Sequence, residues 1–263
     1  MAHADAEPQP NSYGFLDMYH HAFRSLVADP RELQLALRSI LPVSHKLFGE
    51  VAAGAYFSLF TAKLGPDAMF QWSMGGGIWS RFDLISTEKD LQVTDYNASM
   101  PLDFQYGRWA TRILPYHMSS HLGDDYIKRT GILGEKYSFD ALKLLQAFEP
   151  TPQWRLYAGY QYTIRWEHAS LGRSMLQSGL EWTSRPWASG RVETFWANDL
   201  QNWERVGWNP MVHTQLGMHF RRDAEAAQKL SLYVEYAAGH REHGQFYNQK
   251  ESHWGLGLKL DLW

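Results

Sequence analysis

The chain has 263 residues, of which 25 are basic and 28 acidic, so its formal net charge is −3, and it contains no cysteine. A disulfide framework and a thiolate metal site are therefore excluded, and the slightly acidic balance argues against a nucleic-acid partner, which would need a basic face. No run of about eighteen apolar residues occurs, which argues against a transmembrane helix.

The first 28 residues are predicted to form an N-terminal region ahead of a single domain over 29–263. Residues 1–12 are polar and contain proline, so we expect no regular structure there. Residues 14–28 place Phe15, Met18 and Phe23 at helical spacing, which predicts a short amphipathic helix at the rim or inside the domain. An irregular lead-in to the first strand is the alternative.

From about residue 30 onward, apolar and polar residues alternate along the chain. In 229–241, for example, Leu230 and Val234 share one face, and Ser231 and Glu235 share the other. This pattern predicts about twelve antiparallel strands. They lie roughly over 31–41, 51–63, 68–84, 91–106, 108–122, 138–149, 154–166, 173–184, 190–202, 210–222, 229–243 and 252–262.

The length and composition of these strands indicate their environment. A soluble barrel or sandwich also alternates, but it has charge outside and an apolar core inside. Here glycine and charge fall on the polar face, and 12 Trp and 14 Tyr suit aromatic girdles at two membrane interfaces. The pattern predicts an all-β fold, a transmembrane antiparallel β-barrel in the outer membrane of a Gram-negative bacterium. An aromatic-rich soluble β protein is the alternative.

This location carries further expectations. The chain opens without the basic and apolar regions of a signal peptide, so we expect that an export signal has been removed. The expected partners are outer-membrane lipids, lipopolysaccharide and the barrel-insertion machinery; the oligomeric state stays open. Trp263 is in phase with the polar Lys259 and Asp261, so we expect a missing residue or a bulge at the C-terminal end.

The strand over 154–166 gives the clearest prediction of which residues face lipid. Its even positions are apolar or aromatic, whereas several odd positions are polar. We expect Trp154, Leu156, Tyr160, Tyr162 and Ile164 to face lipid and Arg155, Gln161 and Arg165 to face the lumen.

A His-x-Ser pair occurs in the predicted strand 108–122. Arg108 and Arg112 occupy its even, lumenal face, so His117 and Ser119 lie on the lipid-facing side near the outer leaflet. If the hairpin with 138–149 is symmetric about its loop, Asp140 lies opposite Ser119. These three residues would form a catalytic triad in which Ser119 is the nucleophile, His117 the base and Asp140 the group that orients it. The alternative is that His117 is an interfacial polar residue in an aromatic belt.

The pair resembles the base and nucleophile of two hydrolase families, outer-membrane phospholipase A and the lipid A 3-O-deacylase. Both families use this spacing on the barrel exterior. The residue that follows the serine departs from their pattern, because Ser120 stands where both have asparagine.

Two groups of side chains in the sequence are candidate metal ligands. Asp124 and Asp125 could hold a divalent cation, a calcium ion in a lipase-like protein, although adjacent loop aspartates are usually solvated. His240 and His243 have no third ligand close in sequence, so we predict no histidine metal site and no resident cofactor besides that possible calcium.

Charges of both signs fall on the predicted lumenal faces, and they leave the function open. Arg112, Arg155 and Arg221 are balanced by residues such as Asp103 and Glu235. The leading functional prediction is a narrow channel or an envelope scaffold with a charged lumen. The alternative is a lipid hydrolase that acts on phospholipid or lipid A acyl esters.

Three short fragments also resemble an uncharacterised family of Gram-negative envelope proteins, catalogued as a domain of unknown function. They are ADPRE (28–32), RFDL…EKDL…DY (81–96) and SSHLGDDY (119–126). The resemblance is strongest over about 28–130. It implies an envelope β-barrel and supplies no activity.

Overall fold

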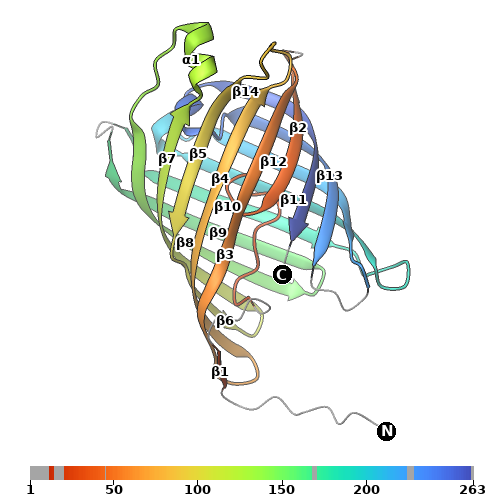
Figure 1. The fold of residues 1–263 in the computed structure, drawn as a ribbon. Helices are drawn as coiled ribbons and strands as arrows, with labels where there is room; N and C mark the ends of the chain where they lie inside the picture. The colour runs from red at the N-terminus through yellow and green to blue at the C-terminus, as the bar shows by residue number, and fades with distance from the viewer. Residues whose placement is uncertain (1–11, 15–20, 45, 168–170, 224–227, 262–263) are drawn as a thin grey trace.

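The computed structural model describes residues 12–14, 21–44, 46–167, 171–223 and 228–261, and these form a tilted ring of antiparallel strands (Figure 1). The short helix α1 (Asp124–Thr130) lies at one end of the ring. Two single-turn 3-10 helices, η1 (Glu204–Val206) and η2 (Gly244–Phe246), occupy connections at the same end. None of the helices described is long and apolar enough to cross a membrane.

The strands confirm the prediction of an antiparallel β-barrel. They are β1 (Ser12–Gly14), β2 (Leu35–Pro42), β3 (Phe48–Lys63), β4 (Ala68–Asp83), β5 (Leu91–Ser99), β6 (Leu102–Tyr106), β7 (Trp109–Leu122), β8 (Tyr137–Thr151), β9 (Trp154–Trp166), β10 (Ser174–Thr183), β11 (Val192–Trp203), β12 (Pro210–Phe220), β13 (Lys229–His240) and β14 (Lys250–Asp261).

The ring has twelve positions, as predicted, and it is closed. Apart from β5 and β6, consecutive strands from β2 to β14 pair with each other, and β14 pairs back onto β2. β5 and β6 share one position between β4 and β7 because the predicted strand 91–106 is interrupted at Met100 and Pro101. Proline has no N–H to donate to a neighbouring strand. β1 adds a short pairing to the end of β3. Closure leaves no unpaired sheet edge, which a barrel in hydrocarbon requires.

The two faces of the wall differ as the alternation predicted. On β13, Leu230 and Val234 are 46% and 45% exposed, whereas Ser231 and Glu235 are at most 1% exposed. On β9, Leu156 and Tyr160 are exposed and Gln161 is fully buried. The apolar side chains therefore form the outer wall, and the polar side chains fill the lumen.

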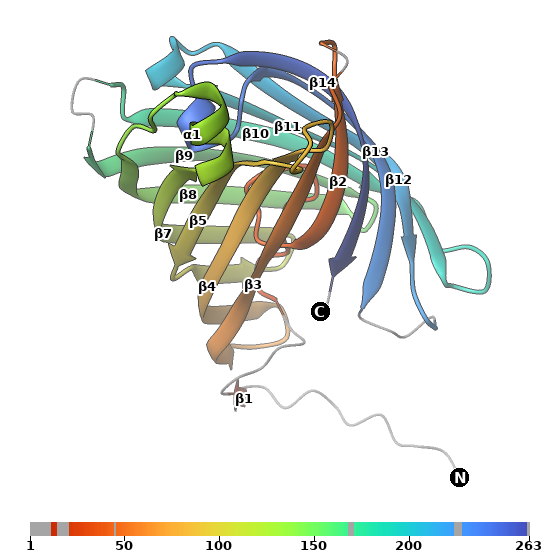
Figure 2. The ribbon, with the colours of Figure 1, turned by 45° about the horizontal axis from the view of Figure 1, so that its top comes forward.

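The N-terminal segment 21–34 lies inside the ring, as Figure 2 shows. Its backbone amides bond to lumenal side chains: Ala22 N donates to Gln71, and Val27 N donates to Glu181. Residues 21–28 form no helix, and polar side chains of the wall accept hydrogen bonds from backbone amides of this segment instead. Over residues 21–28 the predicted helix is therefore wrong, and the alternative, an irregular lead-in to the first strand, describes the chain. Residues 15–20 of the predicted helix lie outside the described residues.

Candidate active site on the outer wall

Strand β7 presents the predicted His-x-Ser pair on its outward face. Arg112, Met118 and Ser120 on the even face are buried in the lumen. The His117 side chain is 48% exposed on the opposite face, and Ser119, two residues further along, is half-buried. The pair therefore lies on the outer wall, near the end of the barrel that carries α1.

The pairing of β7 with β8 sets the partner of the histidine. His117 lies directly opposite Asp140, and Nδ1 of the imidazole is 2.7 Å from Asp140 Oδ1. Ser119 lies opposite Ser138, so the predicted register, with Asp140 across from Ser119, was wrong by two residues. The connection 123–136 holds α1 near its start and an irregular stretch after it, so its midpoint does not mark the hairpin axis. Because the shift is even, every side chain keeps its predicted face.

A second serine, which the sequence reasoning missed, also belongs to this cluster. Ser138 Oγ is 3.5 Å from His117 Nε2. With Nδ1 bonded to Asp140, Nε2 is the ring nitrogen that faces the Ser138 hydroxyl, whereas within the described residues Ser119 makes no hydrogen bond to the His117 ring. The signal was available in the sequence, since Ser138 precedes Asp140 by two residues and so shares its face.

The neighbouring strands add an aromatic ring and a positive charge. Tyr96 on β5 pairs with Ser119 and contacts the His121 ring edge-on at a centroid distance of 5.8 Å. Arg165 on β9 is the cross-strand partner of Asp140 and is exposed on the outer wall. The prediction that Arg165 faces the lumen was therefore wrong. A β-bulge in the β8–β9 pairing inserts one residue, Ile164, and reverses the alternation beyond it.

The predicted cation ligands Asp124 and Asp125 lie in the first turn of α1, where both are exposed. Asp125 Oδ1 is 3.3 Å from Lys128 Nζ within the same helix. The helix ends at Gly131, which adopts a left-handed conformation with φ of 70°. A calcium site at these two carboxylates stays a prediction.

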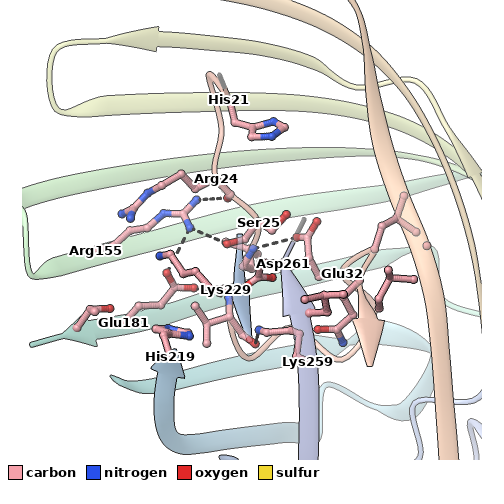
Figure 3. A pocket seen from close by; sticks show the side chains of 18 of the residues that line it. His21, Arg24, Ser25, Glu32, Arg155, Glu181, His219, Lys229, Lys259 and Asp261 are labelled. Atoms are coloured by element: carbon pink, nitrogen blue, oxygen red, sulfur yellow. Dashed lines mark hydrogen bonds and ion pairs between the residues drawn. The ribbon is translucent and has the colours of Figure 1, made fainter. Parts of the chain in front are cut away.

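The lumen contains charged groups that have fixed partners. Arg112 donates to both carboxylate oxygens of Asp103 at 2.8 and 2.9 Å, and its guanidinium lies over the rings of Phe23 and Tyr56. Segment 21–34 thus lies across the interior that a channel would need. A cavity of about 160 Å³ stays open at the end away from α1, lined by Arg155, Glu181, Lys259 and the segment itself (Figure 3).

The closed twelve-stranded ring, with its apolar outer wall and charged lumen, defines a β-barrel of the outer-membrane type. The chain matches the family described as "Protein of unknown function (DUF1207)" over residues 13–262, and it belongs to that family. No curated protein sequence matches it.

Several solved structures share the barrel fold. An active-site mutant of outer membrane phospholipase A from Escherichia coli aligns with a TM-score of 0.56 and 15% identity, covering 93% of this chain and 95% of that one. The Salmonella typhi outer membrane phospholipase dimer with bound calcium aligns with a TM-score of 0.55 and 16% identity, covering 89% of this chain and 94% of that one. The KdgM porin aligns with a TM-score of 0.51 and 6% identity, covering 87% of this chain and 98% of that one. At these identities the likeness concerns the fold alone.

Proposed function

We propose that the protein is a lipid hydrolase of the outer membrane of a Gram-negative bacterium, cleaving acyl esters that reach the barrel wall from the outer leaflet. The observation that carries this proposal is the 2.7 Å contact between His117 Nδ1 and Asp140 Oδ1 on the outer face, with the Ser138 hydroxyl 3.5 Å from Nε2. Ser119 is the cross-strand partner of Ser138. Connections such as 107–108 and 152–153 are short at the end away from α1, whereas 123–136 is long. Long connections face outward in such barrels, so the pair would lie at the outer leaflet.

The chemistry is that of a serine hydrolase. Asp140 accepts the Nδ1 proton of His117 and leaves the lone pair on Nε2. A serine Oγ attacks the ester carbonyl carbon while its proton passes to Nε2. The tetrahedral intermediate then expels the lipid alcohol, which takes that proton and leaves an acyl-serine. Water, deprotonated by Nε2, releases the fatty acid and restores the serine hydroxyl.

Ser119 and Ser138 are both candidates for the nucleophile. The resemblance to the two outer-membrane hydrolase families favours Ser119, which follows His117 by two residues. The distance of 3.5 Å to Nε2 favours Ser138. The two serines are cross-strand neighbours, so both belong to the face of the wall that carries His117.

The surroundings of the pair suit a lipid that carries negative charge. Arg165, across from Asp140 on the outer wall, offers a guanidinium to a phosphate group. The leucines on the same face of β8, Leu142 and Leu144, are exposed and offer a surface for acyl chains. The proposed substrates are therefore phospholipids or the phosphorylated, acylated lipid A.

The similar phospholipases support the proposal in two details. The Escherichia coli protein has an asparagine in its active site, and Asp140 would supply a comparable hydrogen-bond acceptor here. The Salmonella typhi protein is described with bound calcium. In this chain Asp124 and Asp125 would be the carboxylates that hold such an ion, which with backbone amides near Ser120 would stabilise the oxyanion.

The test is acyl release from phospholipid and from lipid A in mixed micelles by the folded, purified protein. We expect His117→Ala and Asp140→Ala to lose activity, and only one of Ser119→Ala and Ser138→Ala to do so. His121→Ala is the matched control, because His121 lies on the same strand face. Absence of acyl release by the wild-type protein from both lipids would refute the proposal.

A second candidate function is a scaffold with a plugged lumen, and segment 21–34 favours it over a narrow channel. The segment is bonded to β4 and β10 on different sides of the ring. We expect no single-channel conductance for the wild-type protein in planar bilayers. Discrete conductance steps would instead support the channel.

A further inference from the structure

Three metal-ligand side chains from distant parts of the sequence meet inside the lumen at the end that carries α1. Glu50 comes from β3, and Glu242 and His243 come from the connection between β13 and β14. One ligand atom from each residue lies within 4.8 Å of the other two, and His243 Nε2 is 3.6 Å from Glu50 Oε1. His243 is 0% exposed and Glu50 is 4% exposed, so water has little access to the group.

The ligand atoms that face one another are not used by the hydrogen bonds of the described chain. Arg38 binds Oε2 of Glu50 and Oε1 of Glu242. Among the described residues, the second oxygen of each carboxylate and both ring nitrogens of His243 are buried without a hydrogen-bond partner, and Glu242 Oε2 lies 3.5 Å from His213 Nε2. Burying such atoms unpaired is costly, and native proteins usually satisfy them with a partner or a bound ion.

Carboxylates and basic groups are interspersed around this point. Arg38 contacts three carboxylates, those of Glu50, Glu235 and Glu242, and Glu235 also lies 3.5 Å from His253. Arg31 is paired with Asp95, and both Arg81 and Arg241 contact Glu251. Glu50 and Glu242 therefore share the guanidinium of Arg38, which leaves the second oxygen of each carboxylate available to a cation.

We propose that Glu50, Glu242 and His243 bind a divalent transition-metal ion, zinc by their donor set. Two carboxylate oxygens and one imidazole nitrogen, each about 2.0–2.2 Å from zinc, match sites with three protein ligands. Ligand atoms in such a tetrahedral site lie about 3.4 Å apart, so the 3.6 Å between His243 and Glu50 needs little adjustment. Arg38, bonded to the outer oxygens of both carboxylates, would hold them in orientation.

The ion would fasten the connection 241–249 to the wall of the barrel. This connection already rests on the lumen through Gly244 N, which donates to Asp95, and Gln245 N, which donates to Ser120 Oγ. A bond from the metal to Glu50 on β3 adds an anchor on another strand. The ion would thus hold this connection in place at the α1 end of the lumen.

The test measures zinc binding to the folded, chelator-stripped protein in detergent micelles by calorimetry and by metal analysis after dialysis. We expect one zinc per chain, with the affinity reduced at least about tenfold in His243→Gln and in Glu242→Gln. His219→Gln is the matched control, because His219 is a buried lumenal histidine bonded to Ser231 near the other end of the barrel. Heat-modifiable migration in detergent gels establishes that each variant is folded.

Two results would overturn the site. One is the failure of folded wild-type protein to retain stoichiometric zinc. The other is unchanged zinc affinity in both His243→Gln and Glu242→Gln, which would place any bound ion on exposed histidines such as His117. If one glutamine variant fails to fold, the other decides the question.

Discussion

Each face of strand β7 carries a basic side chain bonded to an aspartate, one pair in the lumen and the other on the outer wall. On the lumenal face, Arg112 is 2% exposed and bonds to Asp103 from the neighbouring β6. On the outer face, two positions beyond Pro115, His117 bonds to Asp140 while both side chains stay nearly half exposed. Burial of the Arg112 charge would be strongly destabilising without a partner, and Asp103 provides that partner. The outer pair contacts nothing inside the barrel, and it is the pair on which the proposed hydrolase activity depends.

The largest expected effect is on activity. Replacing His117 by alanine removes the proposed general base, and a positioned base contributes about 10²–10⁴-fold to a rate. We expect acyl release to fall by that factor with unfolding in urea unchanged. Equal loss in His121→Ala would show that the strand surface, rather than the His117 base, matters.

The reverse pattern is expected on the lumenal face. Arg112→Ala leaves Asp103 and Glu32 as buried charges without their guanidinium, and breaking such a pair costs about 3–5 kcal/mol. We expect this loss in the free energy of unfolding measured by urea titration in lipid vesicles. Arg222→Ala is the control, because that side chain is 93% exposed. A loss below about 1 kcal/mol would mean that the inner pair is dispensable.

The phase of the outer wall can be tested at Tyr160, which is 45% exposed in the middle of β9. Arginine there meets lipid and is expected to cost about 2–4 kcal/mol of unfolding free energy near the midplane. Tyr160→Phe keeps the apolar ring and is the control. A neutral Tyr160→Arg together with a large loss on changing Gln161 would contradict the assigned faces.

The smallest effect is expected at α1. Asp124 and Asp125 are exposed, and Asp125 is already paired with Lys128. We expect the double Asn variant to change acyl release by no more than about twofold when calcium is absent, since exposed pairs contribute little. A calcium-dependent rate in the wild type that the double variant loses would establish the cation site.

Alternation along single strands was enough to predict the barrel and its two faces. It placed Leu156 and Tyr160 outside and Gln161 inside correctly. It failed at Arg165, because a bulge depends on the pairing of two strands and leaves no mark in the pattern of one.

The partners within the candidate site depended on information that lies outside any strand. The contact of His117 with Asp140 follows from the register of β7 on β8, which an asymmetric connection sets. Glu50 and His243 are almost two hundred positions apart in the sequence. They meet only because the ring closes through the pairing of β14 with β2. Spacing along the sequence therefore gave no third ligand for His243.

The position of segment 21–34 has a consequence for how the barrel assembles. Its partners lie on strands around the circumference, from Gln71 on β4 through Arg155 on β9 to Lys259 on β14. A chain segment with so many anchors has to be enclosed while the ring is still open. We therefore expect its docking and the zippering of β14 onto β2 to be one kinetic step, slow because its contacts span most of the sequence.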